Sequence, residues 1–351
     1  MNAGRPVLVI GCGLIGTSLA LALSEQGRVV HLADAVQANL ELAVSRGAGS
    51  PDPVADPEIV VVAVPPSVVT DVVREALERY PRAVITDVTS VKAGLIAAVE
   101  QSAHGDRFVG GHPMAGKERS GPMAAAARLF EGRPWAIVPT STSTDGAVAT
   151  VTRLAESVGA VPRRMDAATH DRAVALVSHV PHLASVAVAG LLNNAPDGAL
   201  ELAGPGLRDV TRIAGSETGL WIDILSGNAA EVARLLGLLR DSIDSAIASL
   251  GVDPASLTQF LDAGRSGSEL IPGRHGGATE TLAVVYVSVE DRPGELPRLM
   301  ADTGESGVDI KDVRIDHELD RQVGQVEISV LETAADTLVE TLASRGWAVH
   351  R

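Results

Sequence analysis

The chain has 351 residues, enough for two or three domains, and a formal net charge of −15 at pH 7. This acidity argues against nucleic acid or an anionic membrane as a partner, because such surfaces need clustered lysines and arginines. Cys12 is the only cysteine, so an internal disulfide and a cysteine-based zinc site are excluded. We expect no apolar run of the ~18 residues that a membrane span needs and no signal peptide, hence a cytoplasmic protein.

Residues 1–167 are predicted to form a Rossmann-type dinucleotide-binding domain of the α/β class. Short Val/Ile-rich runs recur here, namely "PVLVIG", "RVVHLAD", "EIVVVAVP", "RAVITDV", "RFVGGHP" and "WAIVPT". Helical stretches such as "IGTSLALALSEQG" separate several of them, and Gly27 ends that stretch as a helix C-terminal glycine does. Near-continuous apolar strands separated by helices indicate a parallel sheet covered on both faces.

A nucleotide site is predicted in "VLVIGCGLIGTSLA", where Gly11, Gly13 and Gly16 form the G-x-G-x-x-G pattern between a strand and a helix. The first glycine permits the tight turn, the second lets a pyrophosphate approach, and the third allows close helix–strand packing. Asp34 ends the next strand, where a carboxylate accepts both ribose hydroxyls and repels a 2′-phosphate, so NAD is favoured over NADP. The predicted cofactor contacts are Gly11, Gly13, Leu14, Ile15, Gly16, Asp34, Val64 and Pro65.

The stretch "GGHPMAG" places His112 in a predicted loop at the carboxyl edge of the sheet, near the expected nicotinamide. A histidine with a pKa near 6.5 can accept a proton at neutral pH, as oxidation of a hydroxyl requires. Ser90, in "DVTSVK", arrives at the same edge and can share that hydrogen bond. From position alone, a histidine that merely caps a turn is an equal alternative.

Residues 168–263 are predicted to form an all-α domain, because the strand pattern stops and two long Ala/Leu-rich stretches have helical periodicity. Pro181 is expected to kink the first of them. The helices are apolar over wide faces, so we predict that they pack against a second copy of the chain in a homodimer.

Residues 264–280 are rich in Gly, Ser and Pro and are predicted to be a linker. Residues 281–351 then follow the order strand, helix, strand, hairpin, strand, helix, strand, which predicts a small α+β domain of ferredoxin-like type. The turn "DRPGEL" holds Asp291, Pro293 and Gly294 before a helix whose backbone N–H groups can meet an amino-acid carboxylate.

Five motifs occurring in order resemble the prephenate dehydrogenase family of tyrosine biosynthesis: "GCGLIGTSLA", "DVTSVK", "GGHPMAGKERSG", "SHVPHLAS" and "GLRDVTRIAGSETGLWIDI". Together they spread over residues 7–224. The C-terminal "VEDRPGEL" and "GVDIKDVRI" resemble an ACT-type amino-acid-sensing domain. The resemblance implies NAD-dependent oxidation of the C4 hydroxyl of prephenate, with loss of CO2, to give 4-hydroxyphenylpyruvate.

By this resemblance His112 accepts the C4 hydroxyl proton and Ser90 bonds the same hydroxyl, which makes them the predicted catalytic residues. Arg212 would hold a substrate carboxylate with its bidentate fork. His182 would line the pocket near the side chain that distinguishes prephenate from arogenate. The predicted substrate-binding residues are Arg212, His182, Arg208, His179, Glu118 and Trp221.

Each of these residues also has an ordinary structural explanation: a salt bridge for Arg212, a surface charge for Arg208, packing for the two histidines and a core position for Trp221. His179 and His182 lie three residues apart and in principle could share a metal, but no completing ligand pattern is present, so no metal is predicted. Lys117, which precedes Glu118, is given no role.

Several alternatives remain at this stage. Arogenate dehydrogenase would use the same chemistry on an aminated side chain. A 3-hydroxy-acid dehydrogenase is more distant, because such enzymes usually use a lysine base. A non-catalytic sensor of NAD and an amino acid would have no need of Ser90, His112 and Arg212 together. For the C-terminal domain, tyrosine sensing competes with a purely dimerising role.

Overall fold

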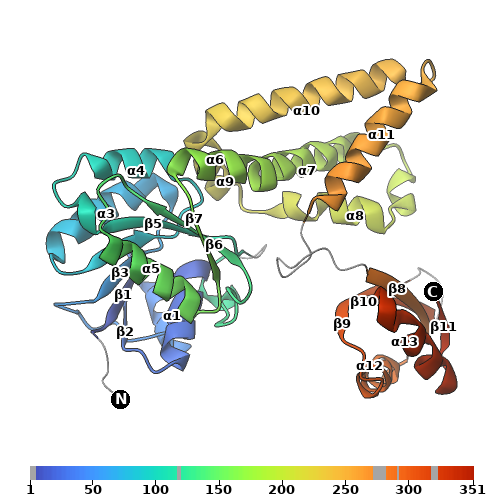
Figure 1. Ribbon diagram of the computed structural model, residues 1–351, viewed down its shortest axis with the longest axis horizontal. Coiled ribbons are helices and arrows are strands. Elements are labelled where there is room, and N and C mark those ends of the chain that lie inside the picture. Colours follow the sequence, from blue (N-terminus) through green and yellow to red (C-terminus); the bar gives the residue numbers. More distant parts are fainter. Residues whose placement is uncertain (1–4, 117–119, 272–281, 291, 318–322) are drawn as a thin grey trace. The chain divides into compact units, whose positions relative to one another are not determined.

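The computed structural model describes residues 5–116, 120–271, 282–290, 292–317 and 323–351 (Figure 1). The chain divides into two compact units, Met1–Phe260 and Leu261–Arg351. The first unit contains both the dinucleotide-binding part and a helical part.

A seven-stranded sheet organises the dinucleotide-binding part, in the order β2-β1-β3-β4-β5-β6-β7. Neighbouring strands are parallel except β5 and β6, which are antiparallel. The strands are β1 Val7–Ile10, β2 Val30–Ala33, β3 Ile59–Val62, β4 Val84–Asp87, β5 Phe108–Pro113, β6 Pro134–Pro139 and β7 Val161–Arg164. The six predicted strands are confirmed; β7 was not predicted, because "VPRR" lacks an apolar run and is half-exposed.

Helices cover both faces of this sheet, as the parallel pattern requires. They are α1 Leu14–Glu25, α2 Gln37–Ser45, α3 Pro66–Arg79, α4 Ala93–Glu100 and α5 Asp145–Ser157. One core contains Leu19 of α1 and Val151 of α5, and the other contains Val73 of α3 and Ile96 of α4. Gly27 has φ +77° just beyond α1, which confirms the predicted helix end.

His112 does not lie in a loop, as the sequence had suggested, but in β5, where it pairs with Ala136 of β6. Gly110 and Gly111 precede it in the same strand. A Cβ on Gly111 would lie 2.6 Å from the backbone oxygen of Asp87, so the glycine allows close packing of β5 on β4. The strand carries the histidine out of the sheet core to the carboxyl edge of β4.

The helical part consists of α-helices linked by short 3₁₀ turns. The α-helices are α6 Ala167–Val174, α7 Val180–Leu191, α8 Pro205–Thr211, α9 Thr218–Gly227, α10 Ala229–Ser249 and α11 Pro254–Glu269. The π-helical segment η3, Ala175–His179, joins α6 to α7 directly before Pro181. The predicted interruption is therefore a π segment, which is how a helix accommodates a local irregularity.

The helical stretch Ala167–Asn194 is long enough to cross a membrane and holds an 18-residue window with a mean hydropathy of 1.6. The expectation that no such run exists is therefore wrong by length and composition. Length and composition alone are weak evidence for a span, and this stretch contains the buried polar residues His170, Asp171, His179 and His182.

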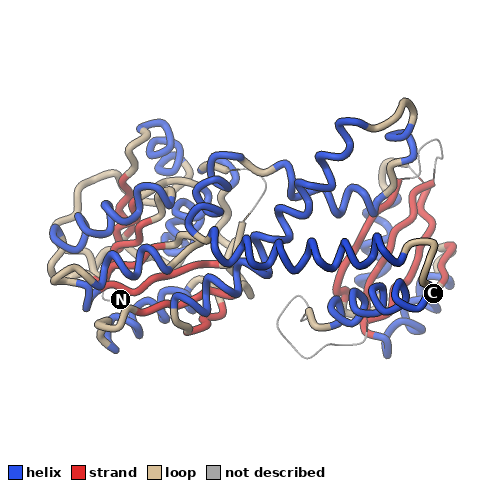
Figure 2. The backbone as a smooth tube through the Cα atoms, turned by 90° about the horizontal axis from the view of Figure 1, so that it is seen from above, coloured by secondary structure: helices blue, strands red, loops and turns tan. Residues whose placement is uncertain are grey.

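The Leu261–Arg351 unit holds a four-stranded antiparallel sheet in the order β11-β8-β10-β9. Its elements are β8 Leu282–Glu290, α12 Glu295–Glu305, β9 Ile310–His317, β10 Val323–Leu331, α13 Glu332–Ser344 and β11 Ala348–His350. Both helices pack on β8 and on each other (Figure 2). The predicted element order and ferredoxin-like topology are confirmed, with a core that includes Leu299, Ile328 and Leu338.

The segment predicted as a linker, residues 264–280, is helical at its start, because α11 continues to Glu269. Gly264 and Gly267 of this segment are exposed on the helix, and a Cβ built on either would have no other atom within 4 Å. Residues 272–280 lie outside the described residues.

Candidate active site

The glycine-rich turn after β1 has the geometry that a dinucleotide needs. Gly11 has φ +105°, and a Cβ there would lie 2.3 Å from the backbone oxygen of Ala63. A Cβ on Gly16 would lie 1.9 Å from the oxygen of Gly11. Nothing lies within 4 Å of a Cβ built on Gly13, so this position is open where a pyrophosphate approaches the N-terminus of α1.

The Asp34 carboxylate, directly beyond β2, lies against this turn. It accepts hydrogen bonds from the backbone N–H groups of Cys12 (2.5 Å) and Val36 (2.7 Å). Each oxygen keeps a lone pair, so the carboxylate can also accept ribose hydroxyls. Burial and the Asp34 charge raise the pKa of the Cys12 thiol to about 12, which keeps Cys12 protonated and unreactive.

His112 is buried and bonded to a second histidine from the helical part. Its Nδ1 lies 2.9 Å from Nε2 of His170 in α6, and Nδ1 of His170 lies 2.7 Å from Oδ1 of Asp171. The relative exposures of His112, His170 and Asp171 are 8%, 1% and 4%. Because Nδ1 is engaged, Nε2 is the nitrogen of His112 that can face a ligand.

Asp171 is held in place by the start of α4. The backbone N–H groups of Lys92 and Ala93 donate to its two oxygens at 2.9 and 2.8 Å. Asn228 donates to the backbone oxygen of Asp171 at 2.7 Å and lies 3.3 Å from Nδ1 of His179. The carboxylate thus caps a helix of the dinucleotide-binding part while bonding a histidine of the helical part.

A buried ion pair lies beneath His112. Lys92, fully buried, donates from Nζ to Oδ2 of Asp87 and to Oγ1 of Thr89. The other oxygen of Asp87 accepts the backbone N–H of Gly111 at 3.2 Å. The pair therefore ties the end of β4 to the residue before His112. Burial lowers the pKa of Lys92, which Asp87 partly offsets.

Burial lowers the pKa of three histidines of this site and so favours their neutral form. The pKa of His112 is lowered well below 6.5, first by desolvation and then by the nearby His170, Lys92 and His179. Desolvation lowers the pKa of His179 to about 4 and lowers that of His182. A neutral imidazole is the form that accepts a proton.

His182 and Trp221 form a stacked pair between α7 and α9. Their ring centroids are 3.5 Å apart and the planes differ by 1°, while His179 meets the edge of the same indole at 6.2 Å. Nδ1 of His182 and Oγ of Ser185 are buried and have no hydrogen-bond partner among the described residues. Unpartnered buried polar atoms point to a ligand, a water or another chain.

The remaining predicted residues are placed as follows. Ser90 is half-buried, three residues beyond β4. Arg208 of α8 and Arg212, which opens the 3₁₀ turn η6 (Arg212–Gly215), are exposed on elements that pack against α7. Val64 and Pro65 join β3 to α3 beside Gly11.

Two predicted residues, Glu118 and Asp291, lie outside the described residues. Pro293 and Gly294 precede α12, where Gly294 has φ +101° and no side chain caps the helix.

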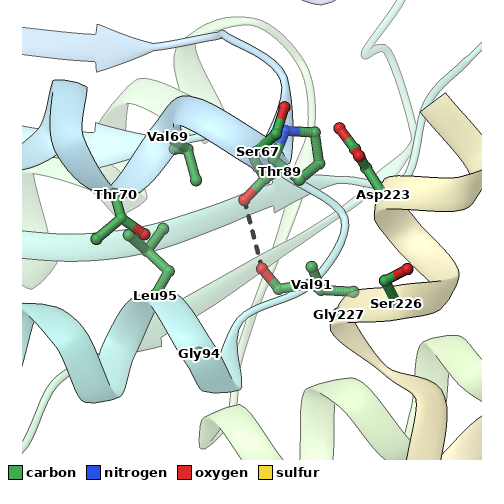
Figure 3. A pocket seen from close by; sticks show the side chains of 11 residues that line it. Ser67, Val69, Thr70, Thr89, Val91, Gly94, Leu95, Asp223, Ser226 and Gly227 are labelled. Atoms are coloured by element: carbon green, nitrogen blue, oxygen red, sulfur yellow. Dashed lines mark hydrogen bonds between the residues drawn. The ribbon is translucent and has the colours of Figure 1, made fainter. Parts of the chain in front are cut away.

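A cavity of about 290 Å³ lies next to the loop that carries Ser90 (Figure 3). It is lined by the start of α3, the loop from β4 to α4 and the face of α9, with Ser67, Thr70, Asp223 and Ser226 as polar side chains. His112 is not among its lining residues, so the cavity adjoins the histidine cluster rather than containing it.

Comparison with known families decides the identity. Residues 19–163 match the prephenate dehydrogenase nucleotide-binding domain, and residues 166–252 match the prephenate dehydrogenase dimerization domain. The probable prephenate dehydrogenase NovF of Streptomyces niveus is 38% identical and 99% of each chain is covered. The chain belongs to the prephenate dehydrogenase family.

Solved structures agree with this assignment. Prephenate dehydrogenase from Aquifex aeolicus, in complex with hydroxyphenyl propionate and NAD+, superposes with a TM-score of 0.69 at 26% identity, covering 76% of this chain and 98% of that one. Arogenate dehydrogenase from Synechocystis superposes with a TM-score of 0.65 at 27% identity, covering 75% and 98%. The chain is thus an NAD-dependent oxidoreductase of the prephenate dehydrogenase family, and the open position at Gly13 and the carboxylate of Asp34 fit its cofactor.

Sequence reasoning missed four polar residues of this family member's site: Lys92, His170, Asp171 and Asn228. Lys92 stands in the quoted "DVTSVK" motif, but a lysine there gives no sign of full burial. The dipeptide His170–Asp171 opens the first long helix, and adjacent titratable residues in an apolar helix were the available signal. Asn228 lies in the turn between α9 and α10, where an asparagine is unremarkable.

Proposed function

We propose that the protein oxidises prephenate to 4-hydroxyphenylpyruvate with release of CO2, acting in the cytoplasm as a homodimer, and that tyrosine regulates it through the C-terminal domain. The observation that carries the catalytic part is the buried, neutral His112, whose Nδ1 is bonded to His170 so that Nε2 is left for the substrate. The family match supports the reaction class.

In the proposed reaction Nε2 of His112 accepts the proton of the C4 hydroxyl as the C4–H bond breaks. NAD, when bound, takes up the hydride from C4. The bond between the ring and its carboxylate then breaks, CO2 leaves, and the bonding electrons complete the aromatic ring. Ser90 is proposed to hydrogen-bond the C4 oxygen, because the loop that carries it follows β4 at the same edge of the sheet.

Arg212 is proposed to bind a carboxylate of the substrate, with Arg208 adding positive charge. Their elements pack against α7, which carries His182, so we propose that the helical half supplies these three groups together. His182 is proposed to meet the side chain of the substrate. Its unpartnered buried Nδ1 and its stacking on Trp221 support this role. His179, whose Nδ1 lies beside Asn228, would shape the pocket behind them.

Arogenate is the alternative substrate. It carries an ammonium group where prephenate has a ketone, and a carboxylate is the natural partner for that group. Asp223 lines the cavity next to Ser90 and favours this alternative. His182, whose pKa burial lowers, suits either substrate, because a neutral imidazole can donate to a ketone or accept from an ammonium group.

Tyrosine regulation is proposed from the turn before α12. Gly294 leads into this helix without a side-chain cap. Glu295 donates its N–H to Arg292 and Pro297 has none, so in this first turn the N–H of Leu296 is the group proposed to meet a carboxylate. Asp291 and Pro293 would complete the turn as predicted from the sequence.

The test is NADH formation by the purified protein with prephenate and with arogenate, each with and without tyrosine. Faster turnover of prephenate that tyrosine suppresses would support both parts of the proposal. A preference for arogenate would keep the mechanism and change the substrate, and turnover unaffected by tyrosine would reject the regulatory part. Turnover of neither compound would reject the proposed reaction.

A further inference from the structure

His170 and Asp171 contact His112 in a linear chain, and the donors and acceptors in that chain can be assigned from one end. The Asp171 carboxylate accepts backbone N–H groups from Lys92 and Ala93, and these bonds, with the bond from His170, hold its pKa below its usual range despite burial. An ionised carboxylate only accepts hydrogen bonds. Nδ1 of His170, 2.7 Å from Asp171, must therefore carry a proton.

The position of the proton on His170 determines the position of the proton on His112. A neutral imidazole has one N–H and one lone pair, so in the neutral form of His170 a proton on Nδ1 leaves the lone pair on Nε2. That nitrogen lies 2.9 Å from Nδ1 of His112, so a single proton lies between them and belongs to His112. His112 is then protonated on Nδ1, and its Nε2 carries the lone pair that a general base needs.

We propose that His170 and Asp171 are positioning residues that hold His112 in the tautomer whose Nε2 accepts the substrate proton. This rests on the base role proposed for His112 above. When Nε2 takes up the substrate proton, every hydrogen bond in the chain keeps its direction. Nδ1–H of His112 still donates to His170, and Nδ1–H of His170 still donates to Asp171, so Asp171 stays ionised and stabilises the new cation without moving a proton.

The chain also joins the two halves of the first unit. His112 belongs to β5, while His170 and Asp171 belong to α6, 58 residues further on. The other charged or titratable groups facing His112 are Lys92, before α4, and His179 of η3. The positive charge of Lys92 disfavours a second proton on His112. The negative charge that stabilises the transient His112 cation is therefore that of Asp171.

The decisive variant is Asp171→Asn. With its oxygen on the N–H of Ala93, an amide in this place would put its NH2 group where the oxygen that Lys92 and His170 share now lies, and would donate to Nδ1 of His170. His170 would then carry its proton on Nε2 and donate to Nδ1 of His112. Both hydrogen bonds then run in the opposite direction, and the proton of His112 moves to Nε2. A protonated Nε2 cannot accept the substrate proton.

The readout is the tautomer of His112 in two-bond ¹H–¹⁵N correlation spectra of the full-length protein with ¹⁵N-labelled histidines. The His112 signals are identified by their loss in His112→Asn. We expect the Nδ1–H form in the unaltered protein and the Nε2–H form in Asp171→Asn. Turnover of prephenate should fall by roughly 10²- to 10⁴-fold in that variant, with the dissociation constant for NAD unchanged.

The matched control is Asp166→Asn. The exposed side chain of Asp166 caps α6 through the N–H of Thr169 and bonds neither histidine. Its backbone oxygen accepts the N–H of His170, and the substitution keeps that bond. This variant makes the same chemical change at the start of the same helix. We expect it to leave the His112 tautomer and the turnover unchanged, so a general effect of helix capping is separated from the positioning role.

A second pair of variants keeps the test valid if Asp171→Asn does not fold. His170→Gln offers an amide oxygen that can accept Nδ1–H of His112, whereas His170→Leu removes the acceptor. We expect His170→Gln to keep the Nδ1–H form and at least about tenfold more turnover than His170→Leu. Equal turnover in the two variants, or an Nε2–H form of His112 in the unaltered protein, overturns the proposal.

The spectra are recorded without substrate, so failure of the positioning proposal can be told apart from failure of the proposed function. If the unaltered protein turns over neither prephenate nor arogenate, the proposed function fails whatever the tautomer. If it turns over prephenate but His112 carries its proton on Nε2 at rest, the function stands and the positioning proposal fails.

Discussion

The two halves of the Met1–Phe260 unit differ in how far the chain covers its own apolar side chains. In the dinucleotide-binding half, Val9, Val61 and Ile137 are at most 1% exposed, because helices cover both faces of the sheet. In the helical half, Leu191, Ile243 and Ile247 are 73%, 46% and 61% exposed. The first half is complete as a fold, whereas the second presents apolar faces of the kind that a partner chain covers.

The same division runs through the site. The dinucleotide-binding half supplies the cofactor turn and His112, and the helical half supplies His170, Asp171, His182 and the two arginines. Damage to the first half should therefore act on chemistry, and damage to the second, apart from His170 and Asp171, should act on assembly and substrate binding. Four predictions test that separation, beginning with the largest effect.

Replacement of His112 by Asn should lower kcat by roughly 10²- to 10⁴-fold, because the substrate proton loses its acceptor. The dissociation constant for NAD should stay within about twofold, because the glycine turn is untouched. Steady-state kinetics and fluorescence titration with NADH measure the two quantities. His104→Asn, at an exposed histidine outside the site, is the control. Retention of kcat would mean that His112 is not the base.

Replacement of Ile243 by Glu should weaken self-association by at least about 100-fold, because an unpaired charge would be buried where α10 meets a partner. Analytical ultracentrifugation over a concentration series measures the dissociation constant. Ser245→Glu places the same charge on the opposite side of α10, by the helical repeat, and should leave association unchanged. If both variants dissociate alike, this face of α10 is not the interface.

Replacement of Arg212 by Ala should raise KM for prephenate by roughly 10- to 100-fold while NAD binding stays the same, because a charge-assisted bond to a carboxylate is lost. Arg240→Ala removes an exposed arginine from α10 and serves as the control. Arg208→Ala should have a smaller effect than Arg212→Ala. A normal KM in Arg212→Ala would place the carboxylate site elsewhere.

The pH profile of kcat/KM gives the smallest expected change. From composition alone the acid limb would lie at pH 6 to 7, near an ordinary histidine pKa. In the structure burial, His170 and Lys92 lower the pKa of His112 well below 6.5. Only the neutral base is active, so activity should be fully present above that lowered pKa and be lost as pH falls through it. We expect kcat/KM to stay level from pH 8 to about 6.5. A fall that begins above pH 7 would contradict the lowered pKa of His112.

The parts of the fold that local sequence patterns control were predicted well. Six strands of the large sheet, the helix end at Gly27 and the order of elements in the C-terminal unit all follow from periodicity and glycine placement. The part that failed was the environment of His112. A stretch with two glycines and a proline suggested a loop, but Gly111 is needed in a strand because β5 packs closely on Asp87 and Trp135 there.

The sequence by itself determined the α/β fold, the nucleotide turn and the family motifs, because each depends on residues that are close together along the chain. Only the tertiary structure decided which groups touch His112. Residues 58 positions apart form the bond from His112 to His170, and no spacing rule connects a strand to a helix at that distance. The burial of Lys92 and the capping of α4 by Asp171 are likewise products of packing, which sets the protonation of the site.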